Sequence, residues 1–293
     1  DALSPEAYGN LADCEYLISR LDIDPDIINH TPNVKFWQRW GAGFDHVDLK
    51  AWGERGIPIA TCPGVNSGIV AELAIMLMLA GYRNLLQINR QLLEGHFPRT
   101  EYFGRSFMIK GKTVGVLGLG HIGKKVAALV TAFGANVIYY DILRQPDQEE
   151  KYGYRFVDFD TLLEQSDIFT VHCPLNEETR GMIGFEQFKK MKPSAMLINT
   201  ARGPIVDEAA MIDALTTGKI ATAGLDTYEH EPLPKDHPLL KLDNVVASAH
   251  AGGNTKDNDI NMVNYVYHNI VAFDRGEPLN TPGDIVNGEF LKK

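Results

Sequence analysis

His250, Arg202 and Glu231 are residues of the types that together handle a proton and an anion. They stand in the stretches ASAHAGG, NTARGPIVDE and GLDTYEHEP. An imidazole titrates near neutral pH, a guanidinium offers paired donors to a carboxylate or carbonyl, and a carboxylate raises the pKa of a neighbouring imidazole. The set therefore suits acid/base chemistry at a carbonyl oxygen. Taken alone, such an arginine is more often an ion-pair residue and such a histidine more often structural.

A glycine-rich turn stands in VGVLGLGHIGKK, residues 114–125, as Gly118-x-Gly120-x-x-Gly123. The spacing alone is a weak signal, but here a predicted strand precedes it and a predicted helix begins in it. Gly118 permits the tight turn, Gly120 lets the backbone approach a pyrophosphate at the helix N-terminus, and Gly123 lets helix and strand pack closely. This context predicts a dinucleotide site.

Asp141 ends the next predicted strand, where an acid accepts hydrogen bonds from the adenosine ribose and repels a 2′-phosphate. NAD is therefore expected in preference to NADP, a preference that the nearby Arg144 weakens a little. Hydride transfer between NAD and a 2-hydroxy acid requires a cation for the substrate carboxylate, a proton partner for the oxygen and an anion beside that partner. Arg202, His250 and Glu231 supply these groups.

Short apolar runs alternate with helical patterns from Thr113 onward, which predicts an α/β fold with a parallel sheet covered on both faces. The carboxyl ends of such strands line the ligand crevice, so the loops that hold Arg202, Asp226 and His250 should converge. The runs are VGVLG, NVIYYD, IFTVH, AMLINT, TAGLD and NVVASA.

A smaller α/β unit is predicted before Asn66, with EYLIS, VKFWQ and IPIAT as strands. A helix from Ser67 to about Gly95 would join it to the larger unit. We therefore expect two doubly wound parallel-sheet domains, with a Rossmann NAD-binding domain, residues 67–256, inserted into a smaller flavodoxin-like substrate domain, residues 1–66 and 257–293.

The composition narrows the class of partner. The 293 residues carry a formal net charge of −10, which disfavours nucleic acid and anionic membranes as partners. The most apolar stretch, residues 69–82, is too short for a membrane span and contains Glu72. No signal peptide is evident in DALSPEAYGN, the three cysteines form no Cys-x-x-Cys pair, and the nine histidines show no metal-ligand spacing. A cytoplasmic protein without a metal is expected.

The series GAGFDHVDL, GIPIATCPGVNSGIVAE, GKTVGVLGLGHIG, NTARGPIVDE and GLDTYEHEP closely resembles the D-isomer-specific 2-hydroxyacid dehydrogenase family, from about Leu17 to Asn287. The resemblance is to a phosphoglycerate dehydrogenase-like short form, without room for a regulatory domain. It implies an NAD-dependent oxidoreductase of small 2-hydroxy or 2-keto acids. Arg202, Glu231 and His250 would be catalytic, with His250 the proton donor in ketone reduction.

The same resemblance implies further contacts. Asp226 would bind the nicotinamide carboxamide, Ala42 and Gly43 would hold the substrate carboxylate through their backbone, and Asn66 would lie near the substrate. Other cofactor contacts are expected at His121, Ile122, His172, Cys173, Pro174, Thr179, Thr200, Ala201 and Gly252. A homodimer is expected because the helix from Ser67 resembles the family's dimerisation element.

Arg20 and Arg39 bear on the choice of substrate, because two guanidiniums in a cleft would suit a second anionic group such as phosphate. An equally good explanation pairs them with Asp22, Asp24 and Asp45 on the surface.

Alternatives remain at this stage. Formate dehydrogenases resemble the chain but have glutamine in place of Glu231, which argues against that activity. A corepressor-like protein of the same fold, which senses NAD and captures peptides, would keep the same catalytic set. An inactive relative is a further possibility, because Ala249 replaces the proline common before His250, and the family usually has another strand and helix before the segment that matches EYLISR. Either that first strand is absent or the small domain is trimmed. The replacement by Ala249 would loosen the loop by freeing a fixed φ.

Overall fold

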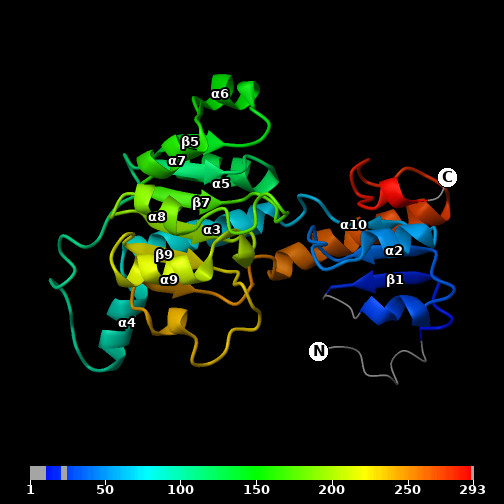
Figure 1. The fold of residues 1–293 in the computed structure, drawn as a ribbon, viewed down its shortest axis with the longest axis horizontal. Coiled ribbons are helices and arrows are strands. Elements are labelled where there is room, and N and C mark those ends of the chain that lie inside the picture. Colours follow the sequence, from blue (N-terminus) through cyan, green and yellow to red (C-terminus); the bar gives the residue numbers. More distant parts are fainter. Residues whose placement is uncertain (1–10, 21–24, 292–293) are drawn as a thin grey trace. The chain divides into compact units, whose positions relative to one another are not determined.

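The computed structural model describes residues 11–20 and 25–291. The chain divides into two compact units, one of Ser67–Gly253 and one of Asp1–Asn66 with Asn254–Lys293. The units separate at Gly253, a few residues before the boundary expected at 256. Each unit is built on its own parallel sheet, so the α/β prediction is confirmed (Figure 1).

In the larger unit, whose residues 67–253 are all described, seven parallel strands lie in the order β10-β9-β8-β7-β4-β5-β6. Strands β7 and β8 are buried along their whole length, as expected of a parallel sheet covered on both faces. The order reverses direction between β4 and β7, which is where doubly wound sheets bind ligands. The strands are β4 (Thr113–Leu117), β5 (Asn136–Tyr140), β6 (Arg155–Phe156), β7 (Ile168–Val171), β8 (Met196–Asn199), β9 (Thr222–Leu225) and β10 (Val245–Ala247).

Helices cover both faces of this sheet (Figure 1). On one face α3 (Ser67–Tyr82) and α5 (His121–Ala132) bury small and branched side chains against β4 and β8. On the other face lie α7 (Phe159–Gln165), α8 (Phe185–Lys190) and α9 (Glu208–Thr216). The connections also contain α6 (Pro146–Tyr152) and two short 3-10 helices, Gly203–Ile205 and Pro238–Lys241.

The helix expected from Ser67 to about Gly95 is two helices, α3 and α4 (Leu85–Leu93), which is a correction to the sequence analysis. They are bent by 62° at Asn84, whose φ of +50° lies in the left-handed region that asparagine tolerates. Among the described residues, no single helix has the length and apolar character to cross a membrane, although this bent pair together would meet those criteria.

The smaller unit has a three-stranded parallel sheet, β1-β2-β3, among its described residues. Its strands are β1 (Tyr16–Ser19), β2 (Phe36–Arg39) and β3 (Ile59–Ala60). Trp37 of β2 packs on Trp52 of α2 (Leu49–Glu54), and Phe36 stacks on Phe273 of α10 (Lys256–Asp274). The unit also holds the 3-10 helices Pro25–His30 and Gly288–Phe290.

Candidate active site

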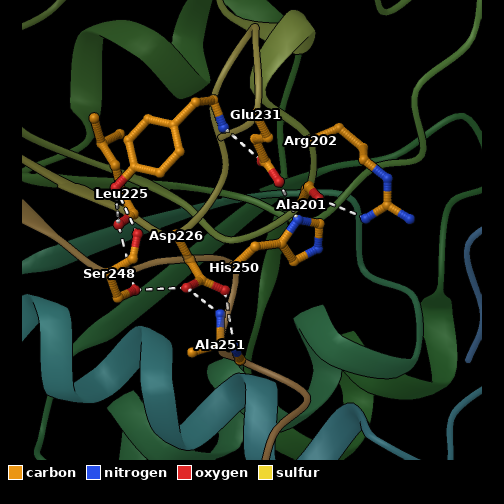
Figure 2. A network of polar contacts seen from close by, with 10 residues as sticks. Ala201, Arg202, Leu225, Asp226, Glu231, Ser248, His250 and Ala251 are labelled. Atoms are coloured by element: carbon orange, nitrogen blue, oxygen red, sulfur yellow. Dashed lines mark hydrogen bonds and ion pairs between the residues drawn. The ribbon is translucent and has the colours of Figure 1, made fainter. Parts of the chain in front are cut away.

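The predicted acid/base residues follow neighbouring strands of the larger sheet. Arg202 follows β8, Glu231 lies in the long loop after β9, and His250 follows β10, and these three strands are adjacent. Figure 2 shows their side chains gathered at the carboxyl ends of these strands. The structure therefore brings the three residues together, as the parallel-sheet argument requires.

His250 and Glu231 form the central contact. The ring atom Nδ1 of His250 lies 2.7 Å from Oε2 of Glu231, and the second oxygen of that carboxylate accepts a hydrogen bond from the Tyr228 N–H at 3.0 Å. The hydrogen bond and the charge of Glu231 raise the pKa of His250. Burial opposes ionisation of Glu231, but the bonds from His250 and Tyr228 still hold its pKa below the usual value. The pair thus favours a protonated imidazole whose Nε2 lies on the side away from Glu231.

Asp226 fixes the backbone of the histidine loop. His250 has a φ of +50°, a conformation that side-chain-bearing residues rarely adopt. The Asp226 carbonyl accepts the His250 N–H at 2.8 Å, and its buried carboxylate accepts hydrogen bonds from Ser248 Oγ, Ala251 N and Gly252 N at 2.5, 2.8 and 2.9 Å. Asp226 therefore restrains the loop that Ala249 was expected to loosen. Its predicted contact with nicotinamide stays a prediction.

Arg202 is presented by a turn that Asn199 closes. The buried Asn199 donates from Nδ2 to the Arg202 carbonyl at 2.9 Å and accepts from the Ala201 N–H at 3.1 Å. The guanidinium donates to the Ala201 carbonyl at 2.7 Å, and its charge acts against protonation of His250. Asn199, Tyr228 and Ser248 were not predicted to bear on the site. Asn199 and the Tyr228 N–H act through short-range contacts within their own loops, whereas Ser248 reaches Asp226 from the loop after the next strand.

Gly203 joins the arginine turn to the glutamate loop, and changing Gly203 to alanine should impair both folding and activity. A Cβ built there would lie 1.9 Å from the carbonyl carbon of Tyr228. The backbones would have to separate, so we expect a loss of about 1–3 kcal/mol in the free energy of unfolding and a lower kcat. Urea unfolding and keto-acid reduction would measure both.

Gly184→Ala is the matched control, because its Cβ would meet nothing closer than 3.6 Å. A Gly203→Ala variant as stable and as active as this control would show that the two loops are not coupled.

The glycine turn has the shape of a phosphate cradle. A Cβ on Gly123 would lie 2.1 Å from the Gly118 carbonyl oxygen, and one on Gly118, at φ +91°, would lie 2.7 Å from the Cys173 nitrogen. Gly120, the N-cap of α5, has no side chain to cap the helix, and a Cβ there would point into open space. The helix N-terminus, with His121 and Ile122 in its first turn, is thus open to an anion.

Asp141 lies at the carboxyl end of β5 beside this cradle. Its carboxylate accepts hydrogen bonds from the Leu119 N–H at 2.6 Å and the Leu143 N–H at 3.1 Å. Leu119 lies between two glycines of the turn, so the acid is held next to the expected dinucleotide position. Its contact with the adenosine ribose stays a prediction.

Three buried polar atoms lie near the carboxyl ends of β7, β8 and β9. Within the part of the chain that the structure describes, Nδ1 of His172 and the hydroxyl oxygens of Thr200 and Thr227 have no hydrogen-bond partner. Burial lowers the pKa of His172 to about 3, so its ring is neutral. An unpaired polar atom is costly to bury, so such atoms usually have a polar partner. Together with the glycine cradle, they fit a bound dinucleotide. Thr227 was missed in the sequence analysis, although its place directly after Asp226 was a signal.

The remaining predicted cofactor residues lie in loops at the same end of the sheet. Cys173, Pro174 and Thr179 follow β7, where the Thr179 hydroxyl donates to the Pro174 carbonyl at 2.7 Å. Ala201 adjoins the arginine turn and Gly252 belongs to the histidine loop. Across residues 11–20 and 25–291, no three His, Cys, Asp or Glu side chains gather where they could hold a metal ion.

The predicted substrate residues Ala42, Gly43, Asn66, Arg20 and Arg39 belong to the smaller unit. Arg39 is only 7% exposed, and its Nε donates to the Gly43 carbonyl at 3.3 Å. Arg20 donates to Oδ1 of Asn254 at 2.8 Å. Arg39 therefore supports the Gly43 loop from within the unit. The ion pairs considered with Asp22 and Asp24 lie outside the described residues.

Comparison with known proteins decides the family. The family model described as "D-isomer specific 2-hydroxyacid dehydrogenase, NAD binding domain" matches residues 75–252. The chain belongs to the D-isomer specific 2-hydroxyacid dehydrogenase family. The predicted family, NAD as cofactor and, at the level of the family, an oxidoreductase acting on 2-hydroxy acids are thereby confirmed, and the corepressor-like alternative is not favoured.

Comparison with individual proteins supports the same family assignment. A glyoxylate reductase of Thermofilum pendens is 40% identical over 98% of this chain and 85% of its own length. A D-3-phosphoglycerate dehydrogenase of Archaeoglobus fulgidus is 42% identical over 89% of this chain, which spans only 49% of that relative. The structure of an Aquifex aeolicus D-lactate dehydrogenase complexed with NAD and lactic acid matches with a TM-score of 0.86, 28% identity and coverage of 98% and 91%.

Proposed function

We propose that this chain catalyses reversible hydride transfer between NADH and a small 2-keto acid, giving a D-2-hydroxy acid, with His250 as the acid/base. The observation that carries the proposal is the 2.7 Å contact between His250 and Glu231, at the same end of the sheet as the glycine cradle. A protonated imidazole oriented by a carboxylate is the group needed to protonate a carbonyl oxygen as hydride reaches its carbon.

The route of the proton follows from the contact between His250 and Glu231. NADH, when bound, supplies the hydride to the carbonyl carbon of the keto acid. Glu231 accepts from Nδ1 of His250, which leaves Nε2 to give its proton to the carbonyl oxygen. Arg202 donates hydrogen bonds to the substrate carboxylate or carbonyl and so orients the keto acid. In the oxidation direction His250, then neutral, takes the proton back from the hydroxyl group.

The smaller unit supplies the proposed substrate contacts. Backbone N–H groups of Ala42 and Gly43 would hold the carboxylate, and Asn66 would lie near the substrate. Arg39 keeps Gly43 in place through its hydrogen bond to that residue's carbonyl. We infer a compact 2-keto acid such as glyoxylate or hydroxypyruvate, because the relatives that match most of this chain are named glyoxylate reductases.

A substrate panel tests the proposal. Oxidation of NADH is followed by absorbance with glyoxylate, pyruvate, hydroxypyruvate, 2-ketoisocaproate and 3-phosphohydroxypyruvate. We expect turnover with the small keto acids. If Arg20 binds a distal anionic group, the chain should prefer 3-phosphohydroxypyruvate, and Arg20→Gln should lose that preference. NADH binding without turnover of any keto acid would contradict the proposed enzyme.

We also propose that the chain forms a homodimer through α4 and the segment that follows it. None of the residues of α4 is buried, and Leu93, Phe97 and Phe103 are 81%, 79% and 78% exposed. Met76 on α3 is 51% exposed as well. So much exposed apolar surface in one segment is typical of an interface, and a second copy would cover it. The cytoplasmic location stays a prediction from the cysteine pattern.

A double change to aspartate at Leu93 and Phe97 should weaken this dimer by at least about a hundredfold, because each large apolar side chain contributes roughly 1.5–3 kcal/mol when buried. Light scattering after gel filtration would show the mass fall to that of a monomer. Phe185→Asp on α8, 45% exposed and distant in sequence, is the control and should stay dimeric. A monomeric wild-type protein would overturn the proposed assembly.

A further inference from the structure

Arg144 lies in the loop after β5, shortly after Asp141, where a cation would favour a cofactor with an adenosine 2′-phosphate. Its guanidinium is bound by the carboxylate of Glu149. Nε donates to Oε1 of Glu149 at 2.9 Å and Nη2 donates to Oε2 at 2.8 Å. The guanidinium also lies over the ring of Phe156, 5.7 Å from its centroid. A two-point contact of this kind fixes both position and orientation.

Glu149 is itself anchored. Its side chain on α6 is 19% exposed, and its Oε1 also accepts a hydrogen bond from the hydroxyl of Tyr139 at 2.9 Å. Tyr139 is fully buried in β5, and its hydroxyl accepts the Gln145 N–H at 2.8 Å. The bonds from Arg144 and Tyr139 lower the pKa of Glu149 to about 2, so the carboxylate is ionised throughout the working pH range. The carboxylate thus joins the strand, the loop and the helix.

We propose that Glu149 is a specificity-determining residue that holds Arg144 away from the adenosine 2′ position and so keeps the site selective for NADH over NADPH. Asp141 repels a 2′-phosphate directly, whereas Glu149 acts through Arg144 by occupying the Nε and Nη2 donors of its guanidinium. This inference rests on the proposed function, because it takes the glycine turn as the dinucleotide site. Glu149 is a positioning residue that need not touch the cofactor.

The test compares binding of adenosine 2′,5′-bisphosphate with binding of ADP, by titration calorimetry on the full chain. Glu149→Gln keeps an acceptor for Tyr139 but removes the charge that holds Arg144. We expect the affinity for the bisphosphate relative to ADP to rise by about tenfold, the effect of one new charge-assisted contact. The ratio of kcat/KM with NADPH to that with NADH should rise in parallel.

Further variants identify the cause. Adding Arg144→Ala to Glu149→Gln should abolish the gain. Glu150→Gln, at the adjacent exposed acid of α6, removes the same charge and should leave the ratio unchanged. Glu149→Asp keeps the charge on a shorter side chain and should move the ratio in the same direction, which tests the contact again if the glutamine variant is unstable.

An unchanged ratio in Glu149→Gln, an equal gain in Glu150→Gln or a gain that survives loss of Arg144 would overturn the inference. Failure of the wild-type chain to bind ADP at all would be a different result. It would contradict the dinucleotide site and hence the proposed function itself.

Discussion

A His250→Asn variant should reduce keto acids with a kcat lowered by about 10²- to 10⁴-fold, the range for loss of a general acid. Asparagine tolerates the left-handed conformation that the backbone adopts at this position, so the loop should keep its shape. Binding of NADH should stay close to that of the wild type, since the histidine acts on the substrate oxygen. Steady-state kinetics and titration of NADH fluorescence would measure the two effects separately.

His230→Asn is the matched control. His230 is exposed and precedes Glu231 directly, so the same substitution there alters the glutamate loop of the site without touching the proposed acid. Its kcat should stay within about twofold of wild type, as for most surface changes. If His250→Asn kept more than a tenth of the wild-type kcat, another group would have to donate the proton.

A Glu231→Gln variant should show the second large effect, a change in the pH dependence of the rate of keto-acid reduction. Reduction needs protonated His250, so the rate is highest below the pKa of His250 and falls as the pH rises through it. Glu231 raises that pKa, so removing its charge should move the fall to lower pH. At neutral pH we expect kcat/KM for reduction to drop by about 10²-fold, less than for a fully buried pair because the His250 side chain is 49% exposed.

Oxidation of the hydroxy acid should change in the opposite sense. It needs neutral His250, so in Glu231→Gln its pH profile should extend to lower pH. A variant that is merely unstable would lose both directions at every pH, which separates the two explanations. Glu229→Gln, at an exposed neighbouring acid, is the control and should keep the wild-type profile. Unchanged profiles in Glu231→Gln would contradict the role given to this carboxylate.

Patterns that are local in sequence predicted most of the architecture. The buried strands are short apolar runs bounded by turns, and the glycine turn is fixed by the backbone contacts at Gly118 and Gly123. The convergence of Arg202, Glu231 and His250 followed from the rule that parallel strands end at one edge. These features depend on hydrophobic periodicity and chain geometry, which the sequence displays directly.

Contacts between separate loops could not be predicted in this way. The Asp226 carboxylate holds the loop after the next strand, and the left-handed backbone of His250 exists because of those bonds. The burial of Arg39 behind Gly43 and the break at Asn84 likewise depend on tertiary packing. Arg144 was expected to weaken the preference for NAD. The Arg144 guanidinium pairs with Glu149 instead, a contact that depends on the packing of α6 beside β5.

The most direct test of the central claim is the stereochemistry and stoichiometry of the product. The chain would be incubated with NADH and the best keto acid that gives a chiral product, and the hydroxy acid would be resolved by chiral chromatography. The account predicts one D-2-hydroxy acid for each NADH oxidised, and with His250→Asn both product formation and NADH loss should slow together by about 10²- to 10⁴-fold. An L product, or NADH oxidation that does not depend on His250, would contradict it.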